Sequence, residues 1–108
     1  MSFNVKTISV FERQAKRLMK KFPSLKKEIQ TLISELKEEP EKGTSIGHNC
    51  YKIRLANASK GKGKSGGARV ISHLVFKDST VYLLTIYDKS DIENLTDKEI
   101  LELIKLIP

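Results

Sequence analysis

The sequence predicts a single α+β domain over residues 1–108, in which a small, mostly antiparallel β-sheet is packed by an N-terminal helical hairpin and a C-terminal helix. Three observations support this prediction. The chain has 108 residues, the size of one hydrophobic core. Apolar residues follow helical spacing near both ends and strand-like alternation between them. No internal repeat or linker divides the chain, so the expected element order is β-α-α-β-β-β-α.

The first half of the sequence predicts a short strand followed by two helices. Residues 3–8 alternate apolar and polar side chains, as strands do. Ser9 and Glu12 have the spacing of a capping box and predict the start of the first helix. A break at residues 23–24 separates it from a second helix ending at residues 39–40, so the two should pack as an antiparallel hairpin. The apolar stripe of the first helix consists of Phe11, Ala15, Leu18 and Phe22.

The second half predicts three strands and a last helix. Residues 40–50 contain Pro, Gly and Asn and are expected to form a loop. Residues 81–87 are nearly all apolar, which predicts a central strand covered on both faces. Thr96 and Glu99 predict the capping box of the C-terminal helix. The expected strands and their connections are strand 51–55, loop 57–67, strand 68–76, turn 77–80 and strand 81–87.

Composition favours a cytoplasmic protein with an anionic partner. The chain carries a formal net charge of +7 and has a pI near 9.6, which suits nucleic acid. Its one cysteine, Cys50, has no partner for an internal disulfide and fits a reducing compartment. No apolar run approaches the roughly 18 residues of a membrane span, and no signal peptide is recognisable, so we expect no membrane partner.

Most of the positive charge lies in residues 52–69. This segment contains six basic residues and no acidic one. It combines a strand, a glycine-rich loop and the start of a second strand, so we expect a cationic loop at one end of the sheet, suited to a phosphate chain. The six basic residues are Lys52, Arg54, Lys60, Lys62, Lys64 and Arg69.

The loop string GKGKSGG invites comparison with a Walker A loop but departs from it twice. Ala58 stands where that motif needs a glycine, and a strand rather than a helix is expected after the loop. Nucleotide hydrolysis is therefore disfavoured. The glycines still allow backbone N–H groups to approach an anion. The alternative is a mobile hairpin loop with solvated lysines.

Arg69 and Tyr87 are the most specific candidates for chemistry. Alternation places Arg69 on the same face as Ile71 and His73. A guanidinium fixed on a strand can bind phosphate through two parallel hydrogen bonds, and the alternative is an ion pair with an acid of the last helix. Tyr87 and Lys89 lie at the end of the last strand, and their side chains should point to the same side if the strand continues that far. A tyrosine near ammonium groups can serve as a general acid or base, and the alternative is an ordinary packed aromatic residue.

The sequence predicts no metal site. His48, Cys50 and His73 lack the spacing of metal ligands, and no acidic cluster resembles a two-metal centre. No Ser/His/Asp or Cys/His constellation can be recognised in a chain with two histidines.

Three strings together resemble the RelE/ParE toxins of bacterial toxin–antitoxin systems: Y-K-I-R at 51–54, G-K-S-G-G-A-R-V-I at 63–71 and L-L-T-I-Y-D-K at 83–89. The K-S-G-G-x-R loop is most similar to the HigB-like branch, and the likeness covers nearly the whole chain. The resemblance implies an mRNA interferase that cuts messenger RNA on the ribosome and is neutralised by a cognate antitoxin. It also implies chemistry without metal or small-molecule cofactor, in which the ribose 2′-OH attacks the adjacent phosphate.

The same resemblance implies roles for individual residues. Arg69 would stabilise the pentavalent phosphorane, and Lys64, with Lys62, would hold the RNA backbone or serve as the base. Tyr87 or Lys89 would supply the remaining proton transfer. The chain departs from some members of the family after Lys89, where it lacks their C-terminal Tyr or His, so Tyr87 is the candidate donor. Contacts with messenger or ribosomal RNA are assigned to Lys52, Arg54, Lys60, Lys62 and His73.

Two other functions remain compatible with this pattern. ParE-like relatives share the fold but inhibit DNA gyrase by binding it, and a non-catalytic nucleic-acid-binding module would also present a basic face. The basic loop and Arg69 favour the nuclease. The sequence leaves open whether the basic face of the first helix meets ribosomal RNA or an acidic antitoxin; its members are Arg13, Lys16, Arg17, Lys20 and Lys21.

Overall fold

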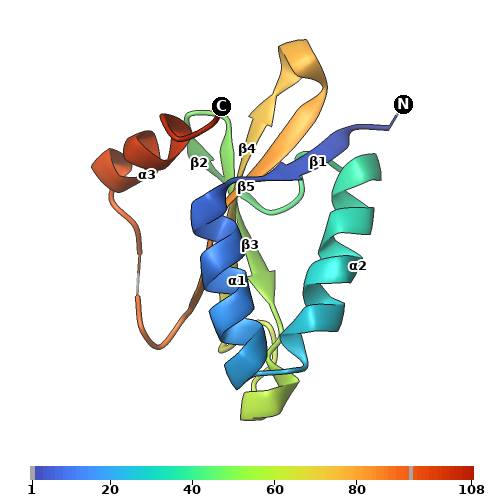
Figure 1. The fold of residues 1–108 in the computed structure, drawn as a ribbon, viewed down its shortest axis with the longest axis vertical. Helices are drawn as coiled ribbons and strands as arrows, with labels where there is room; N and C mark the ends of the chain where they lie inside the picture. Colours follow the sequence, from blue (N-terminus) through green and yellow to red (C-terminus); the bar gives the residue numbers. More distant parts are fainter. Residues whose placement is uncertain (1, 93) are drawn as a thin grey trace.

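The computed structural model describes residues 2–92 and 94–108 and confirms the predicted α+β class (Figure 1). Its sheet has five strands in the order β1-β5-β4-β3-β2, with β1 parallel to β5 and the other pairs antiparallel. The elements are β1 (Asn4–Thr7), α1 (Ser9–Lys21), α2 (Leu25–Glu38), β2 (Thr44–Gly47), β3 (Cys50–Leu55), β4 (Ala68–Val75), β5 (Thr80–Asp88) and α3 (Asp97–Ile104), with short 3₁₀ turns at Ala58–Lys60 and Phe76–Asp78.

The helices α1 and α2 form the predicted hairpin on one face of the sheet (Figure 1). The apolar stripe of α1 is buried as predicted, except that Phe22 lies just beyond the helix end and is half-buried. In α2 the buried residues are Leu25, Ile29, Leu32 and Leu36. Both helices therefore owe their place to one apolar face packed on the sheet.

The predicted capping box at Ser9 is wrong, whereas the one at Thr96 is confirmed. Ser9 is the first residue of α1, and the preceding Ile8 provides no side-chain cap. Glu12 instead accepts a 2.6 Å hydrogen bond from the Thr7 hydroxyl at the end of β1. At α3, the Thr96 hydroxyl accepts from the Glu99 backbone N–H, and the Glu99 carboxylate accepts from the Thr96 N–H.

The predicted loop at residues 40–50 is wrong in part, because it contains β2. This short strand pairs with β3 through a turn at His48 and Asn49, whose φ angles of 56° and 57° lie in the left-handed region. Two left-handed residues in succession make the turn that best joins twisted antiparallel strands. The strand's sequence, TSIG, lacks the apolar alternation that identifies the other strands.

The strand β5 is buried on both faces, as predicted. The helices α1 and α2 cover one face, and residues 94–100, including the start of α3, lie against the other beside Ile71 and Tyr87. This second face of the sheet carries the candidate site. Among the described residues, no helix is long and apolar enough to cross a membrane.

Candidate functional site

The sheet register places Arg54, Arg69 and Tyr87 side by side on three neighbouring strands. Arg69 of β4 lies opposite Arg54 of β3 on one side and opposite Tyr87 of β5 on the other. The next row on the same face contains Lys52, Ile71 and Thr85. Residues far apart in the sequence thus meet at the end of the sheet that carries the glycine-rich loop.

Arg69 is fixed by backbone carbonyl groups of that loop. Its side chain is buried, and its guanidinium donates to the carbonyl oxygens of Lys64 at 2.8 Å, Ser65 at 2.8 Å and Ala68 at 3.1 Å. The alternative of an ion pair with the last helix does not occur in the described part of the chain. Among the described residues, no partner engages the other two of its five guanidinium N–H groups, which remain for another acceptor. Burial and the neighbouring Arg54 lower the pKa of Arg69.

Arg54 is the accessible partner of Arg69. It is exposed, and no hydrogen bond or ion pair within the described residues engages it. The face therefore presents one free guanidinium next to one that is anchored. An anion that neutralises both would relieve their mutual repulsion.

Tyr87 is a buried residue with an unpartnered hydroxyl. Its side chain is 4% exposed, and its Oη has no hydrogen-bond partner among the described residues. It faces a cavity of about 160 Å³ that is also lined by Lys52, Ile71 and Asn94. Burial raises the pKa of Tyr87, and the Arg69 charge opposes this only in part. At neutral pH the side chain is therefore a phenol that can donate a proton.

The loop at residues 57–67 is ordered by its own hydrogen bonds. Asn57 is fully buried, and its backbone carbonyl accepts from the N–H groups of Lys60 and Lys62, while its N–H donates to the Lys62 carbonyl. Gly67 closes the loop against β3: a Cβ atom there would lie 2.0 Å from the Leu55 carbonyl oxygen. A side chain at this position would force the loop away from the sheet.

Lys60 and Lys89 are engaged in holding the loop. The Lys60 ammonium lies 2.8 Å from Asp88 Oδ2 and 3.1 Å from Ser90 Oγ. Burial acts to raise the pKa of Asp88, but the hydrogen bonds from Lys60 and Ser90 outweigh it, and the pKa is lowered. The Lys89 ammonium donates to the Ser65 carbonyl at 2.7 Å. Both side chains were predicted to act on RNA directly, and in this structure both contact the protein itself.

Four cations line a groove beside β3, at the point where its pairing with β2 ends at Thr44 and Lys52. The groove has a volume of about 350 Å³, and its other lining residues are Gly43, Thr44 and Ile53. Gly43, with φ of 104°, lets the chain pass so closely that a Cβ atom would lie 2.6 Å from the Lys52 carbonyl oxygen. None of the described residues that line the groove is acidic, so they form a concave, positively charged surface. The four cations are Lys42, Lys52, Arg54 and Lys64.

His73 lies at the opposite end of the same face. It is paired in the register with Cys50, and its Nδ1 is 3.4 Å from the Cys50 sulfur. Burial lowers the pKa of His73 and raises the pKa of the Cys50 thiol to about 11. The pair is therefore neutral at pH 7 and lacks the thiolate that a nucleophile requires. The structure does not bring His73 together with the other predicted RNA-binding residues.

Four residues of the site were missed by the sequence analysis. Lys42 lies in a segment expected to be a featureless loop, and Asn94 in the connection to α3, where its side-chain oxygen accepts a 2.9 Å hydrogen bond from Lys52. Asn57 and Asp88 act through the loop, as described above. The Asn-Ala-Ser-Lys-Gly string is typical of a tight turn and could have pointed to Asn57. No local signal identifies the other three. Among the described residues, no group of three His, Cys, Asp or Glu is arranged to hold a metal ion.

Comparison with known proteins gives a consistent identification. A family model described as "RelE toxin of RelE / RelB toxin-antitoxin system" matches residues 6–107. The E. coli toxin RelE, solved as a double arginine-to-alanine mutant in the free state, superposes with a TM-score of 0.64 at 19% identity, covering 100% of both chains. That structure shows the same fold, and the family match spans nearly the entire sequence. The chain belongs to the RelE toxin family of toxin–antitoxin systems.

Proposed function

We propose that this toxin is a ribosome-dependent mRNA endonuclease of the HigB-like branch, which stops translation in the cytoplasm and is neutralised by a cognate antitoxin. Membership of a toxin–antitoxin family implies the antitoxin partner. The observation that carries the proposal is the row formed by Arg54, Arg69 and Tyr87. It places two guanidinium groups and a phenol next to a groove whose lining, among the described residues, consists of cations and neutral side chains.

This arrangement supplies the groups that metal-independent RNA cleavage requires. The 2′-oxygen attacks the adjacent phosphorus, and we assign the uptake of its proton to Lys64 as the general base. Arg54 and Arg69 stabilise the negative charge of the phosphorane through charge-assisted hydrogen bonds. The bond from phosphorus to the 5′-oxygen then breaks, and Tyr87 donates its proton to that oxygen. The products are a 2′,3′-cyclic phosphate and a 5′-OH.

Of the remaining predicted residues, some bind the RNA phosphates and others hold the glycine-rich loop in position. Lys52, Lys62 and Lys64 hold the phosphates on either side of the cleaved bond. Lys60 and Lys89 act indirectly, because their contacts with Asp88 and Ser65 fix the loop. Tyr87 is covered by residues 94–100, so RNA reaches its hydroxyl only when this cover shifts and Lys52 exchanges Asn94 for a phosphate.

The deciding experiment is a cell-free translation reaction with the purified toxin, followed by primer extension on the messenger RNA. We expect cuts within codons that appear only when ribosomes are present and that the antitoxin suppresses. Intact messenger RNA under these conditions would overturn the proposal. If the toxin instead inhibited the DNA supercoiling reaction of gyrase, this result would point to the ParE-like activity.

A further inference from the structure

The strand β5 loses one neighbour and changes register just before it reaches the candidate site. Its pairing with β1 ends at Leu83. At the same point its register with β4 shifts, because Ser72 lies opposite Leu83 whereas the preceding Ile71 lies opposite Thr85. Leu84 is therefore an extra residue in β5, which makes a β-bulge. Beyond this bulge, the end of the strand keeps β4 as its one strand neighbour.

The bulge determines the face on which Tyr87 lies. In a regular strand, residues two positions apart share a face, so Leu83, Thr85 and Tyr87 would all point to the same side. Here Leu83 and Thr85 lie opposite consecutive residues of β4 and so point to opposite faces. This reversal puts Tyr87 in the row with Arg69. If the bulge were lost while the residues up to Leu83 kept their places, Tyr87 would turn to the face that α1 and α2 cover.

Gln14 of α1 holds the end of β5 where β1 no longer pairs with it. Its side-chain oxygen accepts a hydrogen bond from the Thr85 hydroxyl and another, of 3.3 Å, from the Ile86 backbone N–H. Thr85 and Ile86 are 4% and 1% exposed, so both donors belong to buried residues. Buried donors need partners, and one oxygen serves these two immediately after the bulge.

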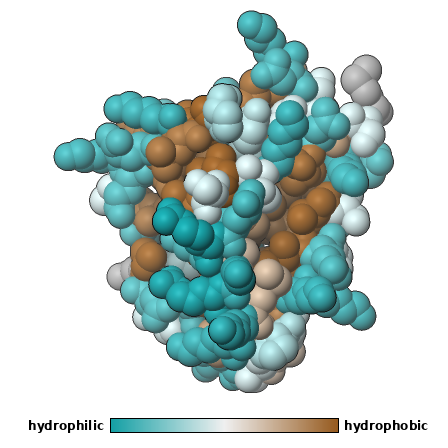
Figure 2. Space-filling view, viewed as in Figure 1, coloured by the Kyte–Doolittle hydropathy of each residue, from teal (hydrophilic) through white to brown (hydrophobic). Residues whose placement is uncertain are grey.

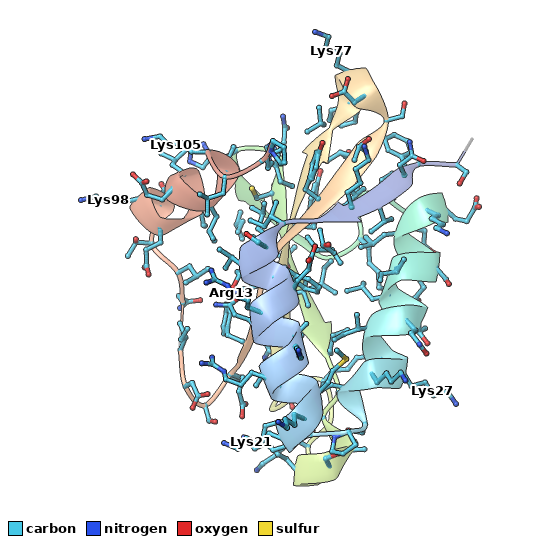
Figure 3. All side chains as sticks on the ribbon, viewed as in Figure 1. Arg13, Lys21, Lys27, Lys77, Lys98 and Lys105 are labelled. Carbon is cyan, nitrogen blue, oxygen red and sulfur yellow. The ribbon has the colours of Figure 1, made fainter. Side chains whose placement is uncertain are left out.

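The space beside this contact is a cavity of about 460 Å³, lined by Gln14, Thr85 and residues between β5 and the end of the chain. Figure 2 shows apolar side chains gathered between α1 and α3, and Figure 3 shows Arg13 on the side of α1 that faces this region. The two acids of the lining are engaged in the cap of α3 and in an ion pair with Lys105. Apolar side chains cannot accept the two hydrogen bonds in place of Gln14. Those that line the cavity are Ile92, Leu95, Leu103 and Leu106.

We propose that Gln14 is a positioning residue, whose side-chain oxygen fixes the bulge of β5 and thereby holds Tyr87 in the row with Arg69. The proposal rests on the proposed function in one respect, namely that RNA is cut at this row. Gln14 acts through β5 and does not line the cationic groove. Misplacing a reacting group by about 1 Å can lower a rate by about a hundredfold. Gln14 therefore affects the cleavage step rather than the binding of RNA.

Three substitutions test this role. Gln14→Met removes the acceptor oxygen but keeps the length and helix propensity of the side chain. Gln14→Glu retains an acceptor oxygen and should preserve both contacts, since each uses the oxygen of Gln14. Gln30→Met makes the same chemical change at an exposed position of α2 and is the matched control. Thermal melting verifies that each variant folds. If Gln14→Met does not fold, Thr85→Val takes its place, because it removes one of the two contacts.

The first readout is single-turnover cleavage of ribosome-bound messenger RNA over a range of toxin concentrations. Gln14→Met should lower the maximal rate at least about tenfold and leave the half-saturating concentration within about twofold, because the cations of the groove are unchanged. Gln14→Glu and Gln30→Met should keep the maximal rate within about threefold. A Met variant at position 14 that cuts at the parental rate would overturn the proposal. So would a Glu variant as slow as the Met variant.

Nuclear magnetic resonance separates this proposal from the proposed function. In Gln14→Met the Ile86 N–H should exchange with solvent at least about tenfold faster than in the parent. The nuclear Overhauser effect between the Tyr87 ring and the Ile100 side chain, which line one cavity, should weaken as well. If the parent cuts RNA but neither signal changes, the positioning role fails and the nuclease stands. If no RNA is cut but both signals change in the Met variant and not in Gln14→Glu, the nuclease fails and Gln14 remains the residue that positions Tyr87.

Discussion

The two ends of one sheet face carry rows of reactive side chains with opposite properties. At the loop end, Arg54, Arg69 and Tyr87 lie beside a cationic groove. At the other end, His73 lies between Cys50 and Tyr82 on the same three strands. The His and Cys would be the more obvious catalysts from their chemistry alone, yet burial keeps both neutral. The comparison indicates that the surroundings set the capacity for catalysis: cations beside a groove that can admit an anion at one end, and a neutral His–Cys pair at the other.

Of the substitutions that test this difference between the two ends, Tyr87→Phe should have the largest effect on RNA cleavage. Loss of a general acid lowers cleavage by about a hundredfold to ten-thousandfold. The free energy of unfolding should stay the same or rise by up to about 1 kcal/mol, because the hydroxyl has no partner to lose within the described part of the chain. Single-turnover cleavage of ribosome-bound messenger RNA and urea unfolding measure the two quantities. A variant that cuts at the parental rate would remove Tyr87 from the mechanism.

Arg69→Ala should lower cleavage by at least tenfold to a hundredfold, or about 1.4–3 kcal/mol of transition-state stabilisation. The change removes a phosphorane contact and the two hydrogen bonds by which Arg69 holds the loop, those to the Lys64 and Ser65 carbonyl groups. Cleavage rates of the parent and the variant, measured at high and low salt, test this expected loss.

Arg69→Lys is the matched control, since it retains the charge but cannot keep the forked contacts. Full recovery of Arg69→Ala at low salt would show that Arg69 supplies affinity alone. Growth arrest equal to that of the parent would exclude it as a catalytic residue.

Asp88→Asn should destabilise the loop end of the sheet by about 1–3 kcal/mol at pH 7, because a nearly buried carboxylate loses its charge-assisted bond with Lys60. The folded-state pKa of Asp88 is lowered from its usual 3.8, so its contribution is present above pH 3.8 and is lost as the pH falls through the folded value. Urea unfolding at several pH values should therefore show parent and variant converging below pH 3.8. A difference that does not change with pH would contradict the assigned role of this ion pair.

The smallest effect on cleavage is expected from a substitution at the other end of the sheet face, in the row that contains Cys50 and His73. Cys50→Ala should leave cleavage within about twofold, because the thiol lies outside the groove and is not ionised. With a pKa of about 11, roughly one thiol in a thousand is a thiolate at pH 8, so alkylation of the folded parent should be slow and should accelerate as the pH rises. Rapid alkylation by iodoacetamide at pH 8, followed by mass spectrometry, would show that this end of the sheet is reactive after all.

The sequence predicts the elements of this fold well where periodicity is strong. The stripes of α1 and α2, the buried β5 and the Thr96 cap follow from spacing alone. The strand β2 was missed because its four residues carry no alternation. Its signal lies in the His48-Asn49 turn, where Asn tolerates the left-handed conformation.

The candidate site could be predicted only in part, because sequence patterns do not reveal contacts between distant segments. Alternation places Arg69 and His73 on one face, but it cannot say that Arg69 turns back onto the carbonyls of its own loop. Nor can it show that Lys60 meets Asp88, since this contact joins residues 28 positions apart. Sequence spacing identifies which face a side chain occupies, whereas its partners depend on how distant segments meet.

The parallel pairing of β1 with β5 has a consequence for how the toxin is made. Asn4 is aligned with Thr80, so β1 can pair with β5 only after residues 80–83 have been synthesised. Tyr87 lies on that same late strand. A nascent chain that ends before β5 would contain both arginines of the row but neither the phenol nor the pairing that completes the sheet. We therefore expect nascent chains that end before β5 to show no toxicity.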